Sequence, residues 1–345
     1  MISKIIAEDL IDEGKQLIFD SENIVILAHQ GPDGDAIGSS LAMYHFLLEI
    51  GKSSFVILPD AIPENLAWLP GAENIVIYEQ KPSFAQSLIN KTDLIICLDF
   101  NETKRLGDEL GNIIKDSSAS KLMLDHHLNP ANEFDVMISY PSISSNAEII
   151  FRFICRMGFF EELNTECATC IFTGMMTDTG FFSYNSSDPE FFIIISELLK
   201  KGINKDAIYN HILNTNSETQ IRLKGYVLHQ KIKFYPEYHS AIITLSKDEM
   251  LQFNVKKGDT EGFVNIPLSV KGIYFSIFLK EDDNKIKVSL RSKGSFAVNE
   301  VSAKKFSGGG HLNAAGGELK KMSMDEAVKY AEDVIQEYQQ ELTEN

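Results

Sequence analysis

The first half of the chain alternates short, mostly apolar runs, of which 24–28 is fully apolar, with longer stretches of helical periodicity. The apolar runs have the length and composition of buried strands, and they lie at residues 24–28, 54–58, 74–78, 93–98 and 121–124. A helix is predicted over 36–50, where Gly51 provides a natural C-terminal stop. This alternation predicts an α/β fold whose N-terminal domain is an open parallel sheet flanked by helices.

The pattern changes toward the C-terminus. Helices are predicted over 144–157, 164–176, 189–200 and 217–233, and strands over 239–245, 272–279 and 285–291. The turn Asp282-Asp283-Asn284 makes the last two strands a hairpin, and helices are predicted over 298–306 and 324–342. We therefore expect a catalytic domain at 1–190, a helical linker at 191–235 and a smaller mixed-sheet α/β domain at 236–345. The active-site cleft is expected between the two domains.

Composition and charge narrow the class of protein. The 345 residues are 44% hydrophobic and 23% charged, as in a soluble globular protein. The first ten residues include Lys4, Glu8 and Asp9, which excludes an apolar signal-peptide core, and no apolar run reaches the roughly 18 residues of a membrane span. We expect a cytoplasmic protein. A net charge of −17 without a long Lys/Arg run argues against binding long duplex nucleic acid and favours a small phosphorylated substrate.

Acidic and histidine side chains follow the ends of several predicted strands, where open α/β sheets bind their ligands. They are His29, Asp33, Asp35, Asp99, Asp125, His126 and His127, and Asp178 follows a predicted helix. Carboxylates and imidazoles without thiolates suit Mn²⁺, with Mg²⁺ as the alternative. So many carboxylates indicate two divalent cations, and such a pair implies hydrolysis of a phosphate ester or anhydride.

Four segments in this order resemble the motifs of the DHH phosphoesterase superfamily. They are HQGPDGDAIGS, LDF, LDHH and TDTGFF. The later segment GGGHLNAAG, preceded by VSLRSK, resembles the DHH-associated C-terminal domain. Together these segments span nearly the whole chain, and within the superfamily they are most similar to the bifunctional oligoribonuclease and pAp-phosphatase proteins.

The resemblance implies a role for each position. The ligands of the first cation would be His29, Asp33 and Asp99. The ligands of the second would be Asp35, Asp99, His126 and Asp178, so that Asp99 bridges the pair. A carboxylate can do this because its two oxygens span cations about 3.5–4 Å apart. Asp125 would orient a histidine ring, and His127 would lie near the scissile phosphate.

A second group of residues would hold the substrate away from the metals. Gly308-Gly309-Gly310 predicts an anion-binding backbone nest beside His311, although a bare glycine triplet is often a flexible turn. Arg291 is suited to bidentate phosphate binding, with an exposed strand arginine as the alternative. Arg105 follows Asp99 closely and could reach the cleft, unless it is a solvated helix residue.

The sequence thus predicts a hydrolase that degrades short oligoribonucleotides, and linear dinucleotides such as pApA, to mononucleotides, and that also converts pAp to AMP. The alternatives are a manganese-dependent inorganic pyrophosphatase and a non-catalytic nucleotide-binding protein, which would not need every ligand position intact. The acidic charge disfavours a RecJ-type exonuclease, and the lack of apolar spans disfavours a membrane-bound cyclic-dinucleotide hydrolase. The sequence permits a homodimer without indicating one.

One position departs from the family pattern. Asn146, in Ser-Ser-Asn-Ala-Glu, stands where relatives often carry a threonine. We expect this change to affect specificity if the position contacts the substrate, and to leave the metal site unaffected.

Overall fold

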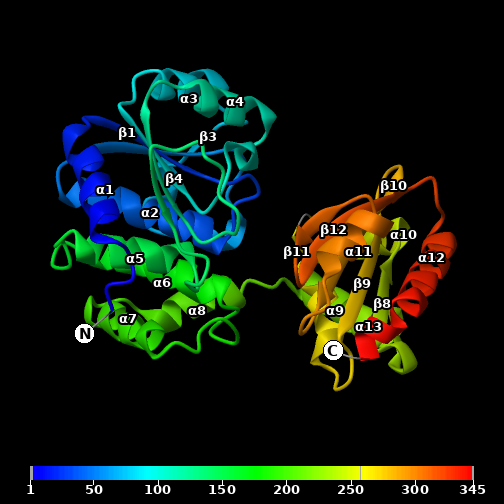
Figure 1. The fold of residues 1–345 in the computed structure, drawn as a ribbon. Helices are drawn as coiled ribbons and strands as arrows, with labels where there is room; N and C mark the ends of the chain where they lie inside the picture. Colours follow the sequence, from blue (N-terminus) through cyan, green and yellow to red (C-terminus); the bar gives the residue numbers. More distant parts are fainter. Residues whose placement is uncertain (1–2, 257, 344–345) are drawn as a thin grey trace. The chain divides into compact units, whose positions relative to one another are not determined.

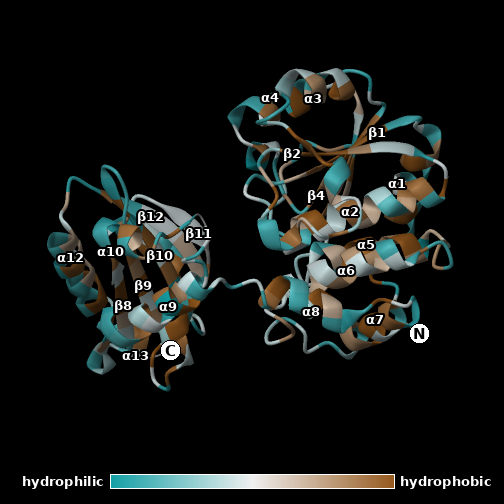
Figure 2. Ribbon diagram, turned by 180° about the vertical axis from the view of Figure 1, so that it is seen from behind, coloured by the Kyte–Doolittle hydropathy of each residue, from teal (hydrophilic) through white to brown (hydrophobic). Residues whose placement is uncertain are grey.

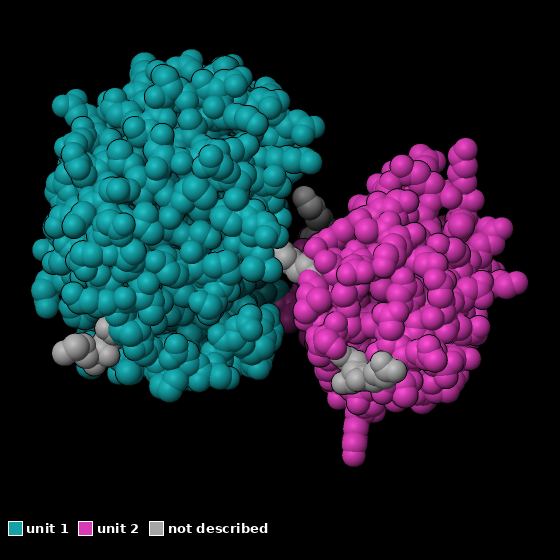
Figure 3. All heavy atoms as spheres, viewed as in Figure 1, with its two compact units in different colours: residues 1–215 teal, residues 216–345 magenta. Residues whose placement is uncertain are grey.

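Residues 3–256 and 258–343 are described by a computed structural model. The chain divides into two compact units, Met1–Thr215 and Asn216–Asn345, which are coloured separately in Figure 3. The boundary between the units, after Thr215, lies within the stretch 191–235 that was expected as a helical linker. The cleft expected between the domains stays a prediction.

The first unit contains a six-stranded sheet in which all neighbouring strands are parallel. Its strands are β1 (Asn23–Ala28), β2 (Ser53–Leu58), β3 (Val76–Ile77), β4 (Leu94–Leu98), β5 (Ser120–Asp125) and β6 (Val136–Ser139). Their order is β3-β2-β1-β4-β5-β6. The chain therefore reverses its direction of travel across the sheet between β1 and β4, and ligands bind at such a switch point in open α/β sheets.

Helices cover both faces of this sheet (Figure 1). On one face lie α1 (Glu8–Asp20), α2 (Gly34–Glu49) and α5 (Asn146–Arg156), and on the other lie α3 (Pro82–Ile89) and α4 (Asp108–Asp116). Helix α6 (Thr165–Asp178) packs against α2 and α5, α7 (Pro189–Lys200) packs against α6, and α8 (Lys205–Leu213) follows α7 in the chain. Alternate residues of β1 enter two separate cores. Val25 and Leu27 pack in the core that includes α3 and α4, whereas Ile24 and Ile26 pack in the core that includes α2 and α5. Most residues of the central strands are accordingly hydrophobic (Figure 2).

The second unit contains a six-stranded mixed sheet in the order β11-β12-β10-β9-β8-β7. Its strands are β7 (Ile232–Tyr235), β8 (Ser240–Leu245), β9 (Phe275–Glu281), β10 (Lys285–Ser292), β11 (Gly309–His311) and β12 (Ala314–Lys320). The β8–β9 pair is parallel and the other pairs are antiparallel. The helices are α9 (Glu218–Tyr226), α10 (Lys247–Gln252), α11 (Val298–Lys305), α12 (Met324–Glu337) and α13 (Gln339–Thr343). Helices α11 and α12 contribute to the core on one face, and α9 contributes to a core that includes Ile243, Leu245 and Phe278.

The structure confirms the predicted fold class of a parallel sheet followed by a mixed sheet, and it corrects several elements. The run 74–78 forms a strand over only two residues, and β6 and β12 were not predicted. The helix predicted over 217–233 ends at Tyr226, and a π-helical turn leads from it into β7. The predicted C-terminal helix is divided into α12 and α13. Among the described residues, no helix is long and apolar enough to cross a membrane.

Candidate metal centre

The candidate site lies at the C-terminal ends of the three central strands of the first unit. His29 follows β1, Asp99 follows β4, and Asp125 ends β5 just before the two histidines. Asp33 and Asp35 lie at the beginning of α2, and Asp178 is the last residue of α6. The structure therefore brings together all eight acidic and histidine residues that the sequence analysis selected in this half of the chain.

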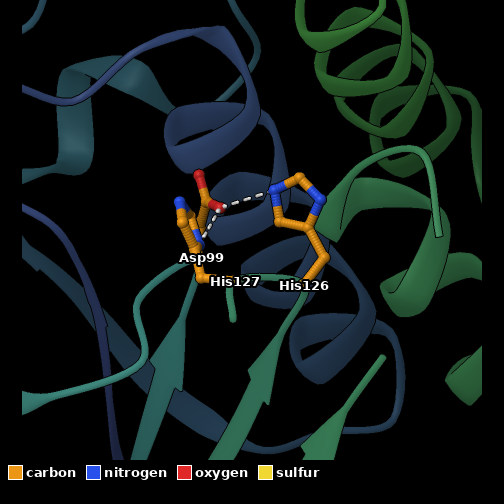
Figure 4. Close-up of side chains that lie close together, drawn as sticks. All are labelled: Asp99, His126 and His127. Atoms are coloured by element: carbon orange, nitrogen blue, oxygen red, sulfur yellow. Dashed lines mark ion pairs between the residues drawn. The ribbon is translucent and has the colours of Figure 1, made fainter. Parts of the chain in front are cut away.

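Asp99 lies at the centre of the cluster. Its Oδ2 is 3.5 Å from His29 Nε2, and its Oδ1 is 3.4 Å from His126 Nε2 and 3.7 Å from His127 Nδ1. Figure 4 shows the carboxylate between the rings of His126 and His127. Asp99 is buried, and its Oδ1 has no hydrogen-bond partner among the described residues. Because a buried carboxylate oxygen normally has a partner, this atom is suited to bind a cation.

Three sets of ligand atoms lie at or beside Asp99. The first set is His29, Asp33 and Asp99, the second is Asp35, His126 and Asp178, and the third is Asp99, His126 and His127. Within each set the ligand atoms lie within 4.8 Å of one another. In the second set, His126 Nε2 is 3.8 Å from Asp35 Oδ2 and 3.7 Å from Asp178 Oδ2. The same nitrogen is 3.4 Å from Asp99 Oδ1, so His126 links the second set to Asp99. The donors are all oxygen or imidazole nitrogen, which fits the hard to intermediate divalent cations.

The histidine rings are held in the tautomer that a metal ligand needs. His29 Nδ1 is 2.9 Å from the Gln30 carbonyl, and His126 Nδ1 is 3.3 Å from the Ile143 carbonyl. A carbonyl oxygen only accepts, so each Nδ1 carries a proton and each Nε2 faces the carboxylates, where it can bind a cation in place of a proton.

His127 is held differently. Its Nδ1 is 2.8 Å from Asp125 Oδ1, and its backbone N–H donates to Asp125 Oδ2 at 2.9 Å. The Asp125 carboxylate is fully buried and thus fixes both the ring and the main chain of His127. Because the Asp125 carboxylate only accepts, Nδ1 carries a proton, and this contact fixes the tautomer and the orientation of the ring.

The electrostatics of the cluster favour a bound cation. Burial raises the pKa of Asp35 well above its ordinary value, and the charges of Asp99 and Asp178 add to this. Burial likewise raises the pKa of Asp178 to about 7. Burial opposes the protonation of His126, but the nearby carboxylates, Asp99 first among them, raise its pKa to about 10. Protons thus offset the crowded negative charge when no cation is present, and a divalent cation would neutralise the same carboxylates.

Backbone amides fix the carboxylates that the sequence places here. Asp33 caps α2, and its Oδ1 accepts hydrogen bonds from the N–H groups of Asp35 and Ala36 at 3.0 and 3.1 Å. The carboxylate of Asp35 accepts from the N–H groups of Asn146 and Ala147 at 2.6 and 2.9 Å. These amides form the N-terminus of α5, where the helix dipole favours a negative charge. The sequence analysis missed this support, although the polar run before a predicted helix was a signal for it.

Close packing of α2 against α6 sets the distance between Asp35 and Asp178. A Cβ atom on Gly38 would lie 2.6 Å from the Cys170 carbonyl oxygen of α6, and one on Gly174 would lie 2.8 Å from Asp35 Oδ1. Only glycine permits this approach of two helix backbones. The sequence analysis did not identify these glycines, because nothing in the chain pattern shows which helices touch.

Arg105 lies beside the first motif loop. It belongs to a short 3-10 turn (Thr103–Leu106), and its carbonyl accepts a hydrogen bond from the Gln30 N–H at 2.7 Å. Its side chain is half-buried. The turn is anchored by Glu133, whose carboxylate accepts from the N–H and the hydroxyl of Thr103 at 3.0 and 2.8 Å. A role in substrate binding stays a prediction for Arg105.

The predicted substrate-binding residues Arg291, Gly308–Gly310 and His311 lie in the second unit. Gly309 to His311 form β11 and pair with β12, so the glycine segment is a strand edge rather than a free turn. A Cβ atom on Gly308 would lie 1.9 Å from the Gly316 carbonyl oxygen, so strand packing requires glycine there. Ala314 pairs with both Arg291 and His311, which therefore occupy one row of the sheet. The side chain of His311 lies outside the described part of the structure.

Comparisons with known proteins agree with this geometry. Residues 23–175 match the model of the DHH family, N-terminal domain, and residues 238–337 match that of the DHHA1 domain. The chain is 30% identical over 321 residues to a bifunctional oligoribonuclease and PAP phosphatase NrnA of Thermus thermophilus, covering 93% of this chain and 90% of that protein. It is 25% identical to the protein of the same name in Bacillus subtilis, covering 91% and 94%.

A solved structure of an exopolyphosphatase-related protein from Bacteroides fragilis is also similar. It is 50% identical, with a TM-score of 0.97, and the match covers 99% of this chain and 100% of the other. Together with the match to both family models, these similarities extend over both units. The chain therefore belongs to the DHH family, in its combination with a DHHA1 domain, and is a hydrolase that acts on phosphoester bonds.

Proposed function

We propose that this protein is a metal-dependent phosphodiesterase and phosphatase that degrades short oligoribonucleotides, and linear dinucleotides such as pApA, to mononucleotides. Hydrolysis of pAp to AMP at the same site forms part of the proposal. The proposal depends on the cluster of acidic and histidine side chains around Asp99. The two carboxylate oxygens of Asp99 face different rings, His29 Nε2 at 3.5 Å and His126 Nε2 at 3.4 Å. Relatives named as oligoribonuclease and PAP phosphatase support the choice of substrates.

Two divalent cations, Mn²⁺ in preference to Mg²⁺, fit the donors. His29, Asp33 and Asp99 would hold one, and Asp35, Asp99, His126 and Asp178 would hold the other. When bound, such a pair lowers the pKa of a coordinated water molecule toward 7 and neutralises the negative charge that develops on the phosphate. The protein supplies the fixed carboxylates and the neutral Nε2 atoms of His29 and His126, so little reorganisation is needed during the reaction.

His127 would act on the substrate itself. Its Nδ1–H donates to Asp125 Oδ1, with 2.8 Å between nitrogen and oxygen. This hydrogen bond fixes the tautomer and would stabilise a positive charge on the ring during proton transfer. The Nε2 atom could then hydrogen-bond a phosphate oxygen or give a proton to the leaving oxygen. Asp125 acts through His127, because its two oxygens are occupied by the ring and the backbone N–H of that residue.

The second unit would bind the part of the substrate that is not cut. Arg291 and His311 pair with the same residue of β12, so they would act together on a terminal phosphate or base, next to the backbone of Gly308–Gly310. Binding energy from that remote group positions the scissile phosphate at the cations. The guanidinium group of Arg105 would add a positive charge near the first motif loop. A cytoplasmic location and a homodimer stay predictions.

The test is a time course with pApA, a 5′-labelled short RNA, pAp and pyrophosphate, each with Mn²⁺, with Mg²⁺ and with EDTA. Release of mononucleotides from the RNA or pApA that requires a cation would support the proposal, and Asp99→Asn provides the inactive control. Turnover of pyrophosphate alone would contradict it and would leave a pyrophosphatase.

A further inference from the structure

Asn146, the first residue of α5, has a fully buried side chain directly beneath the metal centre. With its amide oriented to satisfy its neighbours, the nitrogen donates to the Leu124 carbonyl at 2.8 Å. The oxygen accepts from the Asp99 N–H and from Ser39 Oγ, both at 3.2 Å. Leu98 and Leu124 form the last pair between β4 and β5. The side-chain amide therefore lies at the end of this ladder, against the Leu124 carbonyl and the Asp99 N–H.

The main chain of Asp99 needs this support. Its φ angle is +62°, in the left-handed region that is unfavourable for residues with a Cβ atom. The Asp99 N–H also reaches the Leu124 carbonyl at 3.2 Å, so two acceptors share this single donor. These contacts hold the backbone conformation that directs the Asp99 carboxylate toward His29 and His126.

The main chain of the same residue holds a second carboxylate. The Asn146 N–H donates to Asp35 Oδ2 at 2.6 Å, and this oxygen is 3.8 Å from His126 Nε2. Asp35 and Asp99 thus face one histidine from two sides, and Asn146 contacts both of them. An asparagine side chain suits this position because its amide donates and accepts at the same time, through two different atoms.

We propose that Asn146 is a positioning residue of the metal centre. Its side chain fixes the backbone of Asp99 relative to Asp35, and this sets the place of the bridging carboxylate. The inference rests on the two-cation site of the proposed function. It differs from the expectation from sequence, in which the asparagine left the metal site unaffected and changed specificity only if the position contacts the substrate.

The test is a Mn²⁺ titration of the full chain, in which the electron paramagnetic resonance signal of the free ion measures affinity. Asn146→Leu keeps the number of side-chain heavy atoms and removes all three side-chain hydrogen bonds. We expect Mn²⁺ to bind on the order of 10- to 100-fold more weakly to this variant. The spin-coupled signal of a carboxylate-bridged pair should also disappear. Asn146→Thr restores one hydroxyl contact and should recover part of the affinity.

Asn204→Leu is the matched control, because Asn204 caps α8, which carries none of the ligands, through a hydrogen bond from the Ala207 N–H. This variant should bind Mn²⁺ like the wild type. Wild-type affinity in Asn146→Leu would overturn the inference and leave the proposed function intact, whereas a wild-type chain that binds no cation would overturn both. If Asn146→Leu does not fold, Asn146→Thr decides, since unchanged affinity and spin coupling there would also refute the role.

Discussion

Substitution of Gly38 by alanine tests whether the contact between α2 and α6 sets the metal centre. The added Cβ atom would lie 2.6 Å from the Cys170 carbonyl oxygen, whereas ordinary van der Waals contact begins at 3.4 Å. It would also lie 2.9 Å from the Gly174 nitrogen, so both close contacts are with the backbone of α6. Because a helix backbone cannot give way as a flexible side chain can, the two helices must separate by about 0.8 Å.

Two opposing effects determine the change in stability. Overpacking a close contact costs about 1–3 kcal/mol. Alanine in place of glycine inside a helix restores about 0.5–1 kcal/mol. We therefore expect Gly38→Ala to destabilise the first unit by about 1–2 kcal/mol, or about 2–4 °C in Tm for each kcal/mol. Gly225→Ala in α9 is the matched control, because its Cβ would have no neighbour within 4 Å, and it should stabilise slightly.

The same displacement should impair catalysis, because α6 carries Asp178 at its end, 3.7 Å from His126 Nε2. A shift approaching 1 Å can reduce the rate about 100-fold, so kcat/KM should fall by about 10- to 100-fold in Gly38→Ala. Calorimetry in EDTA gives the Tm values, and hydrolysis of pApA with Mn²⁺ gives the rates. If Gly38→Ala were as stable and as active as Gly225→Ala, the helix contact would not control the site.

Three further results are expected. Asp99→Asn, whose left-handed backbone an asparagine accepts, should fold but lose cation-dependent stabilisation and activity, and a retained Mn²⁺-induced rise in Tm would contradict the central position of this carboxylate. Asp125→Asn should lower kcat about 10- to 100-fold with unchanged Mn²⁺ content, because Asp125 holds the ring and the backbone N–H of His127, which is not among the proposed ligands; metal loss measured by atomic absorption would refute this division. Burial opposes the charge of Glu249, but Lys231 and other hydrogen-bond donors outweigh it and lower the pKa of this carboxyl from 4.5 to about 2. The charge therefore stabilises the fold above pH 4.5, and this contribution is lost as the pH falls toward 2. Glu249→Gln should therefore cost about 1–3 kcal/mol at pH 7 and little at pH 2, and a cost that did not change with pH in denaturant titrations would exclude the ionic origin.

The sequence predicted strands best where burial on both faces made the run apolar. This holds for 24–28, 93–98 and 121–124, which correspond to β1, β4 and β5, the strands that carry the site. It failed for β12, whose sequence AAGGELK is rich in residues that disfavour strands, and whose pairing with β10 and β11 comes from tertiary context. It also failed for β7, because the preceding helical pattern gives no local sign of the change at Ile232.

By itself, the sequence determined the chemistry of the site. Carboxylates and histidines at the ends of parallel strands meet at one edge of a sheet, so the cluster of candidate cation ligands followed from the order of strands and motifs along the chain. Tertiary structure alone decided how that cluster is held. The left-handed backbone of Asp99, the amide of Asn146 beneath it and the contact of α2 with α6 at Gly38 all depend on segments distant in sequence. Local patterns record only burial and propensity, whereas these contacts arise when separate elements pack to within hydrogen-bonding distance.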